Sequence, residues 1–129
     1  MAQEREIIAR LENQPGNLAK IGNAMRERNV NIREILASEQ KGKSPVHLLV
    51  DKVPEGMAAL KDAGIEAEEK DILIVELDNR PGTLGEAAEK LQKEGINVDY
   101  AYYSTTEGQT RAAVILGVSD LSKAASILG

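Results

Sequence analysis

The sequence contains no cysteine, no phenylalanine and no tryptophan, and its aromatic residues are three tyrosines. Without cysteine, the chain has no disulfide and no thiolate chemistry. With a single histidine as well, a zinc site with the ordinary number of ligands is not expected. The sequence therefore predicts no bound metal and no cofactor, and a core built from Leu, Ile, Val and Ala.

Long apolar runs and an excess of positive charge are also missing. No stretch approaches the ~20 apolar residues that a membrane-spanning helix needs, and the charged N-terminus lacks the apolar run of a signal peptide. The formal net charge is −5, whereas a nucleic-acid-binding protein usually shows a basic face. We therefore expect a cytoplasmic protein that binds neither membranes nor nucleic acids.

An internal repeat is the most informative feature that the chain does contain. A displacement of 66 residues places Leu-Glu-Asn-Gln-Pro-Gly-Asn-Leu at 11–18 on Leu-Asp-Asn-Arg-Pro-Gly-Thr-Leu at 77–84. Residues 5–50 align with 71–116 without a gap, and nine of the 46 aligned positions are identical. The sequence therefore predicts two similar domains, residues 1–69 and 70–129.

Each repeat predicts the same succession of elements. Short β-branched runs predict strands, and apolar residues at helical spacing predict the helices between them. The expected strands are 7–11, 32–38, 46–50, 72–77, 98–104 and 112–116, and the expected closing helices are 54–63 and 120–128. This order predicts an α+β fold of two tandem ferredoxin-like βαββαβ units, each an antiparallel sheet with its helices on one face.

The two repeats differ at their ends. The first continues with a candidate closing strand at 65–69, whereas the final strand of the second is missing. The charged run at 66–71 is interpreted as a solvated linker. A unit of this size with few large apolar residues is marginal, and an open sheet edge invites pairing, so we expect a homodimer.

The turn after the first strand carries the pattern Asn-x-Pro-Gly-x-Leu in both repeats and is the candidate binding site. Gly16 and Gly82 remove a side chain where a ligand would approach the backbone. The N–H groups of a helix start favour a carboxylate or phosphate, and the carboxamides of Asn13 and Asn79 both donate and accept hydrogen bonds. A plain turn with a capping Asn is the alternative; two copies of the pattern favour a binding site.

These segments resemble the ACT domain, a regulatory module that binds small molecules. The resemblance covers nearly the whole chain twice, and includes Asn-Val-Asn-Ile at 29–32 and Gly-Ile-Asn-Val at 95–98. It implies a standalone tandem pair of ACT domains with no catalytic domain, which binds a free amino acid. It also implies that the ligand alters association with a target enzyme or with another copy of the chain.

In a serine-inhibited dehydrogenase of this family, the effector is held by the turn Asn and by an Asn in the second segment. The resemblance assigns these roles to Asn13 and Asn79 and to Asn31 and Asn97, respectively. A histidine that binds serine in that enzyme is replaced here by Leu11 and Leu77, which favours a ligand with a more apolar side chain.

The helix of each unit separates its two Asn residues. A helix over residues 17–28 spans roughly 18 Å, so Asn13 and Asn31 are expected at opposite ends of their unit. Two units side by side about a two-fold axis would instead bring Asn13 opposite Asn97 and Asn79 opposite Asn31. The sequence therefore predicts a ligand held between paired repeats.

Two other functions compete with amino-acid binding. One is a ligand-free regulatory or assembly subunit of a biosynthetic enzyme. The other is a small acylphosphatase-like enzyme that uses Arg80 and Asn97, although the glycine-rich phosphate loop of such enzymes is missing. The single histidine, His47, is interpreted as a structural or surface residue. We therefore expect no catalytic residues and no enzymatic activity.

Overall fold

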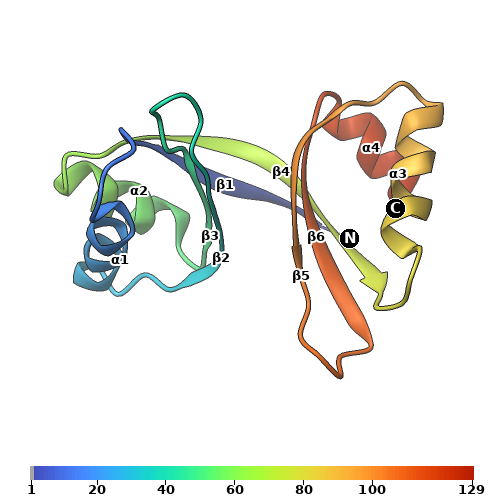
Figure 1. Ribbon diagram of the computed structural model, residues 1–129, viewed down its shortest axis with the longest axis horizontal. Helices are drawn as coiled ribbons and strands as arrows, with labels where there is room; N and C mark the ends of the chain where they lie inside the picture. The colour runs from blue at the N-terminus through green and yellow to red at the C-terminus, as the bar shows by residue number, and fades with distance from the viewer. Residues whose placement is uncertain (1) are drawn as a thin grey trace. The chain divides into compact units, whose positions relative to one another are not determined.

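A computed structural model describes residues 2–129, which form two compact units. The first unit comprises residues 5–70, and the second comprises residues 2–4 and 71–129. In each unit, two helices lie on one face of an antiparallel sheet (Figure 1). The predicted α+β fold of tandem ferredoxin-like units is thereby confirmed.

The first unit has the predicted order of elements. They are β1 (Ala2–Arg10), α1 (Asn17–Glu27), β2 (Ile32–Ala37), β3 (Val46–Val50), α2 (Val53–Asp62) and the start of β4 (Glu66–Asp78). The strand order is β2-β3-β1-β4, and β3 runs antiparallel to both β1 and β2. Asn29, just after α1, has a φ of 54°, and Asn tolerates this left-handed conformation at a helix end.

The core of the first unit lies between the sheet and its helices. Successive side chains on a strand point to opposite faces, so alternate residues of β1 and β3 meet the helices. Apolar residues three or four positions apart do the same on a helix. The buried cluster includes Ile7, Ala9, Val46, Leu48 and Val50 of the strands and Ile21, Met25, Ala59 and Leu60 of the helices.

The second unit repeats this arrangement. Its elements after β4 are α3 (Thr83–Lys93), β5 (Val98–Ser104), β6 (Arg111–Val118) and α4 (Leu121–Leu128). The strand order is β1-β4-β6-β5, and its core includes Leu73, Val75, Leu91, Val114, Leu116 and Ala124. As after α1, a left-handed residue follows α3, here Gly95 with a φ of 69°.

The N-terminal residues complete the sheet of the second unit. Residues 2–4 belong to this unit, and β1 is the neighbour of β4 in the strand order. They therefore take the position for which the second repeat has no closing strand of its own. In the first unit, the same position is taken by the beginning of β4, where the sequence predicts a closing strand at 65–69.

The offset between the repeats changes within the hairpin before the third strand. Ile7 pairs with Leu48, and a constant offset of 66 would pair Leu73 with Val114; Leu73 instead pairs with Leu116. From this hairpin on, the offset is 68. The gapless alignment is therefore wrong beyond the second strand, and the strand predicted at 112–116 extends from Arg111 to Val118.

The charged run at 66–71 is not a linker, because it lies within the continuous strand β4. Its charges meet opposite charges on β1. Arg5 Nη1 lies 3.4 Å from Glu69 Oε1, and Arg10 forms an ion pair with Glu68. Charged residues can therefore occupy this strand because the neighbouring strand offers them partners.

Candidate functional site

The first Asn-Gln-Pro-Gly turn connects β1 to α1. The backbone N–H of Asn13 donates to the Gly42 carbonyl at 2.8 Å, and that of Ser44 donates to the Leu11 carbonyl at 2.8 Å, so the β2–β3 hairpin holds the turn. Gly16 precedes α1 with a φ of 93°, and a Cβ added there would meet nothing within 4 Å. The glycine is therefore required by its left-handed backbone conformation, and it leaves open space beside the helix start.

The second turn connects β4 to α3 and has the same backbone conformation. Gly82 precedes α3 with a φ of 93° and equally open space beside it. Asn79 donates its backbone N–H to the Thr110 carbonyl at 2.9 Å, and its Nδ2 donates to the Gln109 carbonyl at 2.8 Å. Neither α1 nor α3 is capped by a side chain, so the turn Asn residues do not act as helix caps.

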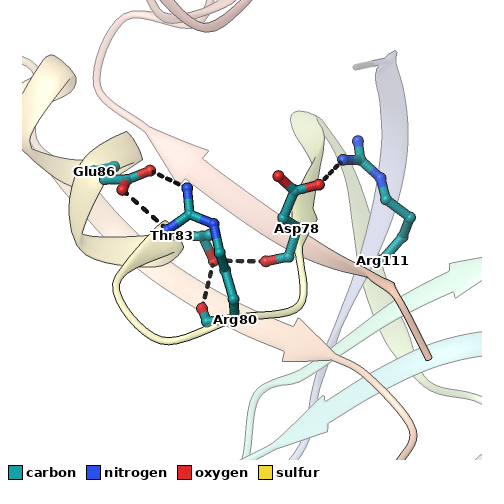
Figure 2. Close-up of polar contacts among 5 residues, drawn as sticks. All are labelled: Asp78, Arg80, Thr83, Glu86 and Arg111. Carbon is teal, nitrogen blue, oxygen red and sulfur yellow. Dashed lines mark hydrogen bonds and ion pairs between the residues drawn. The ribbon is translucent and has the colours of Figure 1, made fainter. Parts of the chain in front are cut away.

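The first residue of each helix fixes its turn, a role that the sequence analysis missed. Asn17 Nδ2 donates to the Glu12 carbonyl at 2.7 Å. Thr83 Oγ1 lies 2.8 Å from the Asp78 carbonyl and 3.2 Å from the Arg80 carbonyl (Figure 2). Both side chains are buried. In the sequence, both residues could have been recognised as small residues that directly follow the glycine and whose side chains can donate a hydrogen bond.

The structure places Asn31 away from Asn13 within the first unit. Asn31 precedes β2, and its N–H donates to Asp51 Oδ1 at 2.9 Å, just before α2, whereas Asn13 contacts the β2–β3 hairpin. Asn97 occupies the equivalent place: its N–H donates to Ser119 Oγ at 2.9 Å and its Nδ2 donates to Asp99 Oδ1 at 2.8 Å. Each unit thus holds its two predicted site residues at different ends of its sheet.

Separate hollows lie beside the two Asn residues of the first unit. One of about 500 Å³ is lined by Asn13, Gly16, Leu18, Ser38 and Ser44, among others. Another of about 470 Å³ is lined by Asn31, Arg26, Asp51 and Lys52, among others. Both are open to solvent, which suits exchange with a small, soluble ligand.

The two leucines that are predicted to contact the ligand are partly covered by the side chains of the cores. Leu11 lies half-buried against the core of the first unit, and Leu77 lies in the same way against the core of the second. Only part of each side chain is therefore available to a ligand.

Charged side chains gather around the second turn (Figure 2). Nη1 and Nη2 of Arg80 donate to the two oxygens of the Glu86 carboxylate, at 3.3 and 3.2 Å. Arg111 Nη1 lies 2.6 Å from Asp78 Oδ1. These residues line a cavity of about 240 Å³. Arg80 and Arg111 are thus paired with carboxylates of their own unit.

His47 is a buried residue of β3 on the sheet face opposite the helices, because it alternates with Val46 and Leu48 of the core. Its Nδ1 is 3.1 Å from Oε1 of Glu6, which is 0% exposed. Because of the changed offset, the equivalent of His47 in the second repeat is Ile115 and not Ala113. The equivalent of Glu6 is Ile72, so a buried polar pair in one unit corresponds to a buried apolar pair in the other.

The fold and the two turns define the class of the protein. A sequence model of the ACT domain pair matches residues 4–127, and the chain therefore belongs to the ACT domain pair family. The resemblance seen in the sequence is thereby confirmed. No curated protein sequence matches this chain.

Two crystal structures illustrate the similarity of the fold. Protein BT0572 from Bacteroides thetaiotaomicron has a TM-score of 0.90 at 22% identity, over 98% of this chain and 86% of its own. The ligand-free regulatory subunit of aspartate kinase from Thermus thermophilus has a TM-score of 0.72 at 21% identity, over 99% of this chain and 93% of its own.

Within residues 2–129, no helix has the length and apolar character needed to cross a membrane.

Proposed function

We propose that this protein is a non-enzymatic, cytoplasmic regulator that binds a free amino acid and thereby alters its association with a target enzyme. Membership of the ACT domain pair family supports a regulatory role. The structural similarity to the regulatory subunit of an aspartate kinase is consistent with a partner of that kind. The observation that carries the proposal is the Asn-x-Pro-Gly turn, which opens onto a solvent-accessible hollow in the first unit.

The turn offers complementary groups to an amino acid. The left-handed glycine exposes the start of the following helix, where backbone N–H groups favour a carboxylate. A carboxamide oxygen accepts from an ammonium group, and its NH₂ donates to a carboxylate. In this proposal, the two turns are the candidate contacts, Asn13 with Gly16 in the first repeat and Asn79 with Gly82 in the second, and Leu11 and Leu77 are the candidate contacts for the ligand's side chain.

The remaining predicted contacts, Asn31 and Asn97, come from a second unit in this proposal. Within the first unit, Asn31 and Asn13 line separate hollows and do not reach one small molecule together. A ligand at a turn is therefore completed by the other Asn of a partner repeat. Pairing of repeats then links ligand binding to assembly, which is what a regulator of association requires.

Exposed apolar side chains support pairing with a second copy of the chain. Leu18 and Leu84 occupy the same position in the first turns of α1 and α3, and both are exposed. Ile35 on β2 and Tyr103 on β5 are exposed as well, and each of these strands lies at the edge of its unit. Such edges and apolar residues favour association, so we propose a homodimer.

The contacts of Arg80 support a non-enzymatic role. An acylphosphatase-like reaction needs a free guanidinium to hold the phosphoryl group. Arg80 instead contacts the Glu86 carboxylate through two nitrogens. The side-chain amide of Asn97, the other residue invoked for that reaction, donates to Asp99.

Thermal denaturation in the presence of each of the twenty L-amino acids tests the proposal. An amino acid present at 100 times its Kd should raise the free energy of unfolding by about 2.7 kcal/mol. The D-enantiomer of the same amino acid is the matched control, because it has the same charges but places its side chain differently. It should produce a much smaller shift.

Absence of a shift with every amino acid would contradict the proposed function. Hydrolysis of an acyl phosphate by the purified chain would contradict its non-enzymatic part. Neither result would affect the assignment of the fold, which rests on the family match and on the described topology.

A further inference from the structure

The two turns have the same sequence pattern and the same backbone conformation, but their asparagines make different contacts. In residues 2–129, the Asn13 carboxamide has no hydrogen-bond partner, and only its backbone N–H is used, by the Gly42 carbonyl. The Asn79 carboxamide instead donates to the Gln109 carbonyl at 2.8 Å. Asn79 thus fastens its turn to the β5–β6 hairpin through both backbone and side chain, whereas the Asn13 side chain is available.

The hollows described near the two turns have different linings. The hollow of about 500 Å³ at the first turn is lined by Asn13 and Gly16 themselves. The cavity of about 240 Å³ near the second turn is lined by Asp78, Arg80 and Glu86, and neither Asn79 nor Gly82 lines it. That cavity therefore does not present the Asn79 carboxamide to a ligand, and its arginines Arg80 and Arg111 already form ion pairs with Glu86 and Asp78 (Figure 2).

The charge at the start of the following helix is also reversed. Glu86 lies in the first turn of α3 and is held beside the second turn by Arg80. The equivalent residue in the first repeat is Lys20, which has no ion-pair partner within residues 2–129, and the first turn of α1 contains no acidic residue. A ligand carboxylate at the second turn would therefore have to compete with Glu86 for Arg80, whereas the ammonium group of Lys20 has no such competitor.

From these three differences, we infer that the amino acid binds only at the Asn13 turn, with one molecule per chain. The Asn79 turn has a structural role instead, because it holds the β5–β6 hairpin. The inference rests on the proposed function and specifies which of its two turns acts. The lining of the first hollow also indicates the class of ligand. Apart from Glu39, its side chains are neutral, and they include the apolar Leu18, Ala19 and Ala37. A neutral amino acid therefore fits better than an acidic one.

Equilibrium dialysis of the full chain against an equimolar mixture of the twenty L-amino acids tests the inference. Amino-acid analysis of the protein compartment then gives the number of molecules retained per chain and their identity. We expect one molecule per chain for the wild type and for Asn79→Ala, and a loss of retention for Asn13→Ala. These two variants form a matched pair, because the substituted residues are equivalent in the two repeats.

Melting temperatures provide the second readout. Asn13→Ala removes no hydrogen bond of the side chain and should leave the unliganded melting temperature unchanged. Asn79→Ala removes the bond to Gln109 and should lower it by about 3 °C. If Asn79→Ala does not fold, Asn79→Asp removes the same donor with a smaller change of volume.

The outcomes separate the two proposals. Retention of two molecules per chain, or retention that depends on Asn79 and not on Asn13, would overturn the inference and leave the proposed function standing. Retention of no amino acid by the wild type would overturn the proposed function, and the inference with it.

Discussion

Replacing Met25 or Leu91 by alanine is expected to lower the free energy of unfolding by about 2–5 kcal/mol, because each substitution leaves a cavity in a closed core. Met25 of α1 is 1% exposed in the core of the first unit. Leu91 of α3 occupies the equivalent position and is 2% exposed in the core of the second. Denaturant unfolding measures the loss, and amide hydrogen exchange locates it in the unit that carries the substitution.

Gln92→Ala is the control for these two variants. Gln92 follows Leu91 on the same helix but is exposed, so its truncation should change stability by no more than about 0.5 kcal/mol. If Leu91→Ala were no more destabilising than Gln92→Ala, the second unit would not have the core described here.

The second large effect is expected at the buried pair of Glu6 and His47. Glu6→Ile is expected to lower stability by about 1–3 kcal/mol, since it removes a hydrogen-bonding partner from a buried imidazole. His47→Ile is expected to lower it by about 3 kcal/mol, because it removes the imidazole from beside a fully buried carboxyl group. Denaturant unfolding of each variant gives the two values.

The second repeat suggests the variant that should compensate. Ile72 and Ile115 occupy the positions of Glu6 and His47 there, and both are buried. Replacing both partners of a buried polar pair by apolar groups is often nearly neutral. The double variant E6I/H47I should therefore be more stable than either single variant. A loss equal to the sum of the two single losses would show that the two side chains are not coupled.

The elements and their order were predictable because their signals are local. Period-two and helical patterns of apolar residues mark the strands and helices of each repeat, and Asn29 and Gly95 mark the ends of two helices. The left-handed glycines of the two turns were predictable for the same reason, since Pro-Gly is a strong turn signal.

Long-range pairing was not predictable from these local patterns. The two-residue change of offset lies in a hairpin where Gly42 and Gly108 align well in sequence, although the strands beyond them pair differently. A constant offset therefore does not align His47 with Ile115, its structural equivalent. The composition of the charged run at 66–71 predicts a linker. Its strand conformation is not apparent from local sequence, because the ion-pair partners of Glu68 and Glu69, Arg10 and Arg5, are distant in the sequence.

The candidate site was predictable only as a pattern shared by both repeats. Sequence identity placed Asn13 and Asn79 in the same role. The hydrogen bond from Asn79 to the Gln109 carbonyl involves the backbone of a distant hairpin, which no residue type reveals. The substitution of Lys20 by Glu86 was visible in the sequence. Its consequence depends on Arg80, which holds Glu86 beside the turn.

Amide chemical shifts of ¹⁵N-labelled protein test the central claim most directly. Addition of the equimolar mixture of L-amino acids should shift the backbone amides of residues 13, 14 and 16–19 and of Ser38, which lie around the first hollow. The amides of residues 79, 80 and 82–85 should remain unchanged in the same titration. Unchanged spectra, or shifts confined to residues outside the first turn and its hairpin, would contradict an amino-acid site at Asn13.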